Sequence, residues 1–122
     1  MEDLEIIKTE IGPAPAWVNT TRRLTVLYQT INEKLLDNRL SINVVLKDFS
    51  LGCNGIHFID TLLWLSGDNL DSISVISDGG WFKAKRKGYK EFNGQIKALT
   101  KLGSSLSIDN TKPISTNQIR LE

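Results

Sequence analysis

The 122-residue chain has one cysteine, one histidine and no long apolar run. One cysteine cannot form a disulfide within the chain, and no segment approaches the roughly 20 apolar residues that a membrane-spanning helix needs. The N-terminal stretch MEDLEIIKTE is acidic and lacks the charged and then apolar layout of a secretory signal. We therefore expect a soluble, cytoplasmic protein with no membrane partner.

The chain also has little net charge. Fifteen basic and fourteen acidic side chains leave a formal charge of +1, which provides no overall field for attracting nucleic acid. The glycine-rich patterns GxGxxG and GxxxxGK, which hold phosphates in nucleotide-binding proteins, are both missing. A nucleic-acid partner would have to depend on a local patch, and the chain by itself has no nucleotide-binding pattern.

Length and composition fit one domain with one core, since 40% of the residues are apolar. Pro13 and Pro15 oppose regular helix and favour an extended connector, so we interpret residues 1–17 as a linker entering the domain. The domain itself is assigned to residues 18–110. Residues 111–122 are assigned to a tail.

The last two residues, Leu121 and Glu122, have a second explanation. A terminal Leu-Glu pair is what a common cloning site leaves between an insert and an affinity tag, so these residues are candidates for a cloning remnant. On this hypothesis the chain is an excised piece of a longer protein. A native stop codon directly after Glu122 would show the hypothesis to be wrong.

Two helices are predicted. Apolar residues at offsets of 0, 3, 4, 7 and 11 form one stripe of an amphipathic helix, capped by Thr20 or Thr21 and ending near Asn38. The stripe consists of Leu24, Leu27, Tyr28, Ile31 and Leu35. A second, apolar helix is expected over residues 56–65, with Asn54 as its N-cap.

Alternation of apolar and polar residues predicts strands at 41–47, 70–77 and 91–99. The sequence DGGW is expected to break the second strand, and the turn KLGSS returns the chain into SLSID as an antiparallel partner. This order favours an α+β fold with two helices packed on one face of a mostly antiparallel sheet. Its other face, with Val45 and Leu99 among polar residues, can be solvated or can pair with another subunit.

The histidine lies at the start of the second predicted helix. There His57 would take the third helical position, where unpaired amides and the helix macrodipole oppose protonation and keep the imidazole ready to exchange protons. Asp60, one turn later, can hold a ring nitrogen or face solvent. This pair suits a general acid or base at the rim of a cleft, although a histidine that satisfies its own hydrogen bonds at a helix start explains the same spacing.

Cys53 allows two further interpretations. Together with His57 and Asp60 it places three metal-capable side chains close in sequence, but a fourth zinc ligand is not evident. Near a helix N-terminus its thiol pKa would be lowered, as in a nucleophile, yet a small buried residue is an equally good explanation. Five basic residues with aromatic neighbours between 82 and 90 form a candidate nucleic-acid patch, a solvated loop or a contact to a substrate anion.

Several segments together resemble the second domain of the glucose-fructose oxidoreductase, inositol dehydrogenase and rhizopine-catabolism family (Gfo/Idh/MocA). They are VNTTRR at 18–23, LGCNGIHFIDTLLWLSG at 51–67 and KAKRKGYKEFNG at 83–94. The resemblance covers roughly residues 17–110. Its most specific element is the H-x-x-D pattern of His57 and Asp60, followed by LLWLSG.

Members of this family are NAD(P)-dependent oxidoreductases with two domains. The resemblance implies that this chain is the second domain, which binds a sugar or polyol and forms oligomers, with an open, mostly antiparallel sheet that is truncated at its C-terminal end. A Rossmann domain preceding it in cis would bind NAD or NADP. The chain alone is then expected to bind no cofactor, to be inactive, and to use its open sheet face for a homo-oligomer.

By position, His57 matches the family histidine that helps move the hydroxyl proton while hydride passes to the nicotinamide. Cys53 stands where many members have an aspartate, so Asn54 is expected to hold a substrate hydroxyl instead. Arg23 would reach a substrate carboxylate or phosphate or form a structural salt bridge, and Asp60 would orient the site. The catalytic candidate is thus His57, and the substrate-binding candidates are Cys53, Asn54, Asp60 and Arg23. A free-standing α+β binding module without catalytic activity is the alternative.

Overall fold

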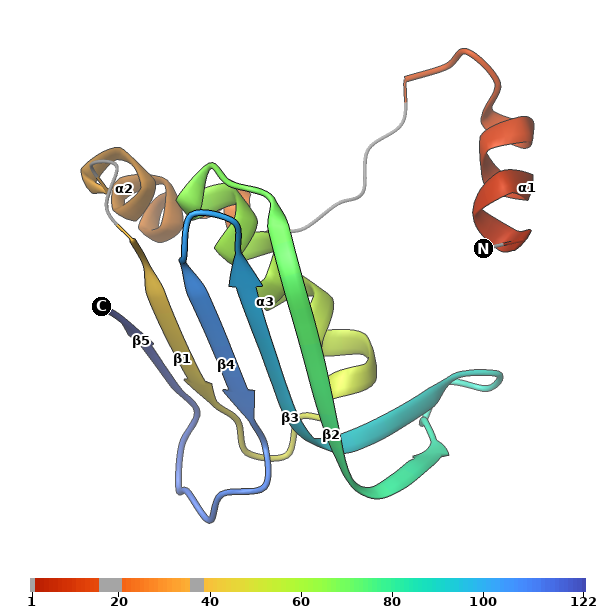
Figure 1. Ribbon diagram of the computed structural model, residues 1–122. Coiled ribbons are helices and arrows are strands. Elements are labelled where there is room, and N and C mark those ends of the chain that lie inside the picture. Colours follow the sequence, from red (N-terminus) through yellow and green to blue (C-terminus); the bar gives the residue numbers. More distant parts are fainter. Residues whose placement is uncertain (1, 16–20, 36–38) are drawn as a thin grey trace.

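The computed structural model describes residues 2–15, 21–35 and 39–122. Its helices are α1 (Glu2–Ile11), the short 3-10 helix η1 (Thr21–Leu24), α2 (Val26–Lys34) and α3 (Leu51–Ser66). Its strands are β1 (Ser41–Val45), β2 (Leu70–Lys83), β3 (Lys90–Thr100), β4 (Ser105–Asp109) and β5 (Gln118–Leu121). Figure 1 shows one sheet with α3 lying along one of its faces.

The five strands form one sheet in the order β2-β3-β4-β1-β5. Only β1 and β4 run parallel, because α3 and the β2–β3 hairpin separate them in the chain, and the other neighbouring strands are antiparallel. The predicted α+β fold, with an open and mostly antiparallel sheet, is therefore confirmed.

The core lies between α3 and the three middle strands. Six α3 residues are buried, and they recur every three or four positions as one face of an amphipathic helix requires: Leu51, Gly55, Phe58, Thr61, Leu62 and Leu65. In β1 the residues alternate between buried and half-buried, which matches the predicted period of two. Full burial of one such leucine contributes about 1.5–3 kcal/mol.

Two glycines let the first turns of α3 approach β3 closely. A Cβ atom at Gly55 would lie 2.6 Å from Ile96 Cδ1, and one at Gly52 would lie 2.6 Å from Glu91 Oε2. The carbonyl oxygen of Lys90 is also within 2.9 Å of that position at Gly52. The start of α3 is therefore held against the end of the β2–β3 hairpin.

Strand β2 is longer than predicted. The DGGW segment does not end it, because Gly79 and Gly80 adopt φ values of 75° and 80° and form a bulge between Asp78 and Trp81, after which pairing with β3 resumes. Across the sheet, Gly94 of β3 has a φ of 145° and lies opposite Ser77. The hairpin turns away from the rest of the sheet beyond this point (Figure 1).

The first predicted helix is divided in the structure. Residues 21–24 form η1, and α2 begins at Val26 after Thr25, so Thr21 belongs to a 3-10 helix instead of capping an α-helix. The helix ends at Lys34, earlier than predicted. Thr20 and Asn38 lie outside the described residues.

Both ends of the chain contain unpredicted elements. Within the segment interpreted as an extended connector, Glu2–Ile11 forms α1, which ends just before Pro13. At the other end, β5 pairs with β1, so part of the predicted tail belongs to the sheet. Ser41 and Glu122 exchange two backbone hydrogen bonds of 2.7 and 2.9 Å. Local apolar patterning could not reveal β5 because its side chains are mostly exposed.

Candidate functional site

Helix α3 starts earlier than the sequence predicted. It begins at Leu51, with Ser50 at the N-cap position, so Asn54 lies within the first turns and does not cap the helix. The Asn54 side-chain amide instead donates a hydrogen bond of 2.8 Å to the Ser50 carbonyl oxygen. With Leu51 as first residue, His57 is the seventh helical residue, and the macrodipole acts mainly within the first turn. The predicted helix-start environment of His57 is therefore wrong.

His57 is half-buried and lies outside the apolar core. It follows Cys53 by four residues and precedes Asp60 by three, a spacing that places the three side chains along one side of a helix. Its backbone carbonyl accepts a 2.7 Å hydrogen bond from the Thr61 hydroxyl. Within residues 2–15, 21–35 and 39–122, no hydrogen bond to the imidazole is present, so the ring can still bind a ligand or a proton acceptor.

Arg23 and Asp60 meet each other. The Arg23 Nε atom donates to Asp60 Oδ2 at 2.7 Å and its Nη2 atom donates to Oδ1, which makes a two-pronged ion pair. The hydrogen bond with Asp60 raises the pKa of the arginine. The guanidinium carbon also lies 5.9 Å from the Trp64 ring centroid. The sequence left two roles open for Arg23, and these contacts fit the structural salt bridge. Contact of Arg23 or Asp60 with substrate stays a prediction.

A neighbouring contact also fastens η1 to α3. The Arg22 guanidinium carbon lies 3.9 Å from the centroid of the Phe58 ring. Phe58 is buried in the core, so this cation–π contact anchors η1 to the rigid part of the domain. The two arginines thus hold the segment that precedes α2 against α3.

A hollow of about 430 Å³ lies where the start of α3 meets the β2–β3 hairpin. Its walls come from the loop before α3, from the first turns of that helix and from the hairpin. The lining residues are Asp48, Phe49, Ser50, Cys53, Asn54, Phe82, Lys83, Ala84, Lys85, Arg86 and Glu91. Cys53 and Asn54, two of the predicted site residues, therefore share one hollow, whereas His57 lies one turn further along the helix.

Glu91 lines this hollow and was not among the site residues predicted from the sequence. Its side chain is buried, and its Oε2 atom accepts a 3.2 Å hydrogen bond from the Cys53 backbone amide. A carboxylate thus occupies the N-terminal turn of α3, where free amides favour negative charge. The sequence pattern placed Glu91 on the polar face of its strand, because nothing local indicates that α3 packs against this end of β3.

The same carboxylate changes the chemistry expected of Cys53. A hydrogen bond with Glu91 and partial burial raise the thiol pKa, and the positive charge of Arg86 opposes this only in part. The thiolate is therefore disfavoured, and the lowered pKa expected of a nucleophile is wrong. Cys53 is also exposed, so it is not the small buried residue of the other interpretation.

The tip of the hairpin brings cations to the hollow. Lys83, Lys85 and Arg86 line it, and the Ala84 amide closes the turn with a 3.0 Å hydrogen bond to the Tyr89 carbonyl oxygen. The Arg86 guanidinium carbon lies 5.3 Å from the Tyr89 ring centroid. Among the residues with described positions, no ion pair involves any basic side chain of this tip. The predicted basic loop is therefore confirmed as a turn, and the structure places it beside Cys53 and Asn54.

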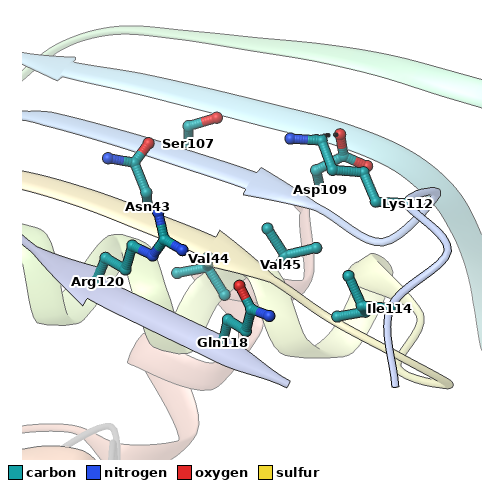
Figure 2. Close-up of a pocket in the computed structure, with 9 residues that line it drawn as sticks. All are labelled: Asn43, Val44, Val45, Ser107, Asp109, Lys112, Ile114, Gln118 and Arg120. Carbon is teal, nitrogen blue, oxygen red and sulfur yellow. Dashed lines mark ion pairs between the residues drawn. The ribbon is translucent and has the colours of Figure 1, made fainter. Parts of the chain in front are cut away.

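A second hollow, of about 350 Å³, lies on the sheet face away from α3 (Figure 2). Its lining includes Asn43, Asp109, Lys112 and Arg120, and Figure 2 shows Lys112 beside Asp109. The Asp109 carboxylate accepts two 2.8 Å hydrogen bonds from the amide and hydroxyl of Thr111. Burial opposes ionisation of Asp109, but the bonds from Thr111, together with Lys112, keep its pKa below the usual value.

Among the described residues, no group of three His, Cys, Asp or Glu side chains is arranged to hold a metal ion. No described helix is both long and apolar enough to cross a membrane.

Comparison with known proteins gives no assignment. No protein-family model matches the chain, no curated protein matches it, and no solved structure matches its fold.

Proposed function

We propose that this chain is the substrate-binding domain of an NAD(P)-dependent oxidoreductase of the Gfo/Idh/MocA type, acting on a hydroxyl group of a sugar, a sugar derivative or a polyol. The observation that carries the proposal is the position of His57. It is half-buried on the exposed side of α3, one turn from the two hollow-lining residues Cys53 and Asn54. A substrate seated in that hollow can extend along α3 to the imidazole.

The chemistry assigned to His57 is proton transfer. Oxidation of a secondary alcohol to a ketone removes a proton from the hydroxyl oxygen and a hydride from the carbon that bears this hydroxyl. The imidazole would take the proton, which is the usual role of histidine as a general base. When bound, nicotinamide supplies the hydride acceptor, and its binding residues are assigned to a separate dinucleotide-binding domain, since this chain has neither glycine-rich pattern.

The substrate contacts are assigned to the hollow. The Asn54 side-chain amide already donates to Ser50, so its carbonyl oxygen remains to accept a hydrogen bond from a sugar hydroxyl. Cys53 lies at the same edge with an exposed side chain, and because its protonated thiol is already hydrogen-bonded to Glu91, it offers the substrate only its sulfur as a weak acceptor. Arg23 and Asp60 support the site by holding η1 against α3. Their direct contact with substrate would require their ion pair to open.

The open sheet face is the surface proposed for a second copy of the chain. It carries exposed Ile76 and Leu99 among polar side chains, on the side opposite α3. Mixed surfaces of this kind occur in non-obligate interfaces. The mass of the protein in solution tests this part of the proposal independently of catalysis.

The alternative is a binding module without catalysis. The cation-lined hollow favours it, because that hollow is complete within this chain and needs no cofactor domain to form. The two functions differ in whether His57 matters for anything beyond stability.

The deciding experiment uses the chain together with the coding sequence that precedes it in the gene. We expect NAD(P)-dependent oxidation of a sugar or polyol, and His57→Asn should lower turnover by roughly 100-fold or more while the protein stays folded. Lys101→Ala, in the exposed turn between β3 and β4, is the matched control and should keep turnover. Full turnover by the His57 variant would remove the residue from the catalytic role.

A further inference from the structure

We propose that the hollow between the start of α3 and the β2–β3 hairpin binds a phosphate or diphosphate group carried by the sugar substrate. This inference rests on the proposed function and deepens it, because it names the class of substrate. It predicts a phosphorylated sugar or a nucleotide sugar in place of a neutral one.

The hollow has a cluster of positive charge on its hairpin side. Lys83, Lys85 and Arg86 all line the hollow and are exposed, and none forms an ion pair within the described part of the chain. Like charges held in one tight turn repel each other, and a bound dianion would relieve that repulsion. Lysine and arginine are also the side chains that proteins use to bind phosphate oxygens.

The turn at the tip of the β2–β3 hairpin is already ordered by its own contacts. The backbone hydrogen bond between Ala84 and Tyr89 closes it, and the Arg86 guanidinium is placed over the Tyr89 ring. Arginine that stacks on an aromatic ring keeps its hydrogen-bond donors free at the edge of the guanidinium plane. Less conformational entropy is then lost when an anion binds.

The two sides of the hollow differ in the charge that they can accept. The N-terminal turn of α3 is already occupied by the Glu91 carboxylate, which accepts the Cys53 amide. An incoming anion is therefore excluded from the helix end and directed to the hairpin side. Glu91 and Asn54 remain on the helix side as acceptors for sugar hydroxyls.

The charge and size of the hollow agree with this division. Its three cations and its two carboxylates, Asp48 and Glu91, leave a surplus of one positive charge (3 − 2), and one of those carboxylates is already held by α3. The volume of about 430 Å³ lies in the range of small-molecule sites, roughly 300–1,000 Å³. In the second hollow, by comparison, Lys112 already lies 3.9 Å from Asp109.

The test measures binding of glucose 6-phosphate, uridine diphosphate glucose and glucose to the 122-residue chain. Calorimetry gives the affinities, and amide chemical shifts show which residues are affected. We expect saturable binding of at least one phosphate-bearing sugar, with shifts at residues 53–54 and 83–86, and at least about tenfold weaker binding of glucose, because charge-assisted hydrogen bonds are lost. The phosphate-bearing sugar that binds more tightly identifies whether a monoester or a diphosphate is the source.

Matched variants separate the hollow from general surface charge. Lys85→Ala combined with Arg86→Ala should weaken binding about tenfold or more, because both charge-assisted contacts are lost. Lys87→Ala, in the same turn but outside the lining, should change it less than about twofold. An equal loss in the Lys87 variant, or tighter binding of a single-stranded oligonucleotide than of either phosphate-bearing sugar, would identify a diffuse polyanion patch and overturn the proposal.

Failure of this inference can be told apart from failure of the proposed function. Binding of the phosphate-bearing sugars needs no cofactor, and the control Lys101→Ala should leave their affinity unchanged. Absence of saturable binding to the wild-type chain would overturn the phosphate site while leaving the turnover test of His57 valid. Binding with the expected variant pattern, but without dependence of turnover on His57, would support the phosphate site and contradict the oxidoreductase.

Discussion

Strands β1 and β2 carry the same kind of alternating sequence and end in opposite environments. In β1 the apolar residues Ile42 and Val44 are almost completely buried, whereas Ile73 and Val75 of β2 are about half exposed, at 48% and 50%. The register places Ile73 and Val75 on the same face as the core residues of β3. Helix α3 packs on the sheet mainly through β3 and β4. Alternation therefore predicts an apolar face, and only the packing of a second layer decides whether that face is buried.

This difference divides the molecule by role. The middle strands and α3 form the core that fixes the position of His57. No residue of β2 is buried, and the hairpin carries the cations of the hollow. Binding groups on an exposed hairpin, held against a packed helix start, follow the general pattern of functional loops positioned by a rigid scaffold.

The substitution Gly94→Ala should break the junction between the two regions and have the largest effect. A Cβ atom there would lie 1.9 Å from the Ile76 carbonyl oxygen, and the φ of 145° is unfavourable for alanine. We expect a loss of about 3–5 kcal/mol in the free energy of unfolding. Chemical denaturation measures it, with Gly79→Ala as control, where the added methyl meets open space and the loss should be about 1 kcal/mol. Equal losses in the two variants would contradict the structure of the bulge.

Truncation of one side chain in each region should show the contrast directly. Leu62 of α3 is fully buried against the sheet, so Leu62→Ala should cost about 3 kcal/mol of unfolding free energy. Ile73→Ala on β2 should cost less than about 1 kcal/mol. Urea denaturation of both variants provides the comparison. A loss at Ile73 as large as that at Leu62 would mean that another surface covers β2 in solution.

The ion pair of Arg23 and Asp60 should make a smaller contribution. Its side chains are 40% and 17% exposed, and solvent screens such pairs. A double-mutant cycle with Arg23→Ala and Asp60→Asn should give a coupling energy of about 1 kcal/mol. A coupling energy near zero would show that η1 is held against α3 by Arg22 on Phe58 and not by this pair.

Acidification should have the smallest and most local effect. The pKa of Asp109 is lower in the folded state than its usual value, so the folded protein binds fewer protons than the unfolded chain in the interval between the two values. Its stabilising contribution is therefore complete above about pH 4 and is lost as the pH falls through the folded-state pKa. Thermal unfolding midpoints should be measured from about pH 6 to about pH 3. They should fall less steeply with decreasing pH in Asp109→Asn than in the wild-type protein. An unchanged slope would contradict this assignment.

Sequence patterns predicted those features that depend on local periodicity. The alternation in 41–47 corresponds to β1 and the turn before SLSID precedes β4, whereas the helical stripe corresponds only in part, with its middle residues in α2. The predicted start of α3 was wrong because Gly52 and Gly55 resemble a turn, whereas in the structure they permit close packing on β3. The break at DGGW was wrong for a related reason, since glycines in a strand also form bulges.

The candidate site was only partly accessible to sequence reasoning. The H-x-x-D pattern selected His57, which lies one helical turn from the hollow-lining residues Cys53 and Asn54, and its role stays a prediction. The meeting of Glu91 with Cys53, and of the hairpin cations with Asn54, depends on contacts between segments about 30–40 residues apart in the chain. No local pattern records such contacts, so the sequence could name the basic run without placing it.

The central claim is that a substrate held by this chain loses a hydride to nicotinamide while His57 takes the hydroxyl proton. The most direct test follows a deuterium label from the oxidised carbon of a sugar substrate, with the chain joined to the dinucleotide-binding domain that we propose for it. We predict that the label appears in the reduced nicotinamide, and that His57→Asn slows this transfer without changing where the label goes. Release of the label to solvent, or transfer at the wild-type rate in the His57 variant, would contradict the claim.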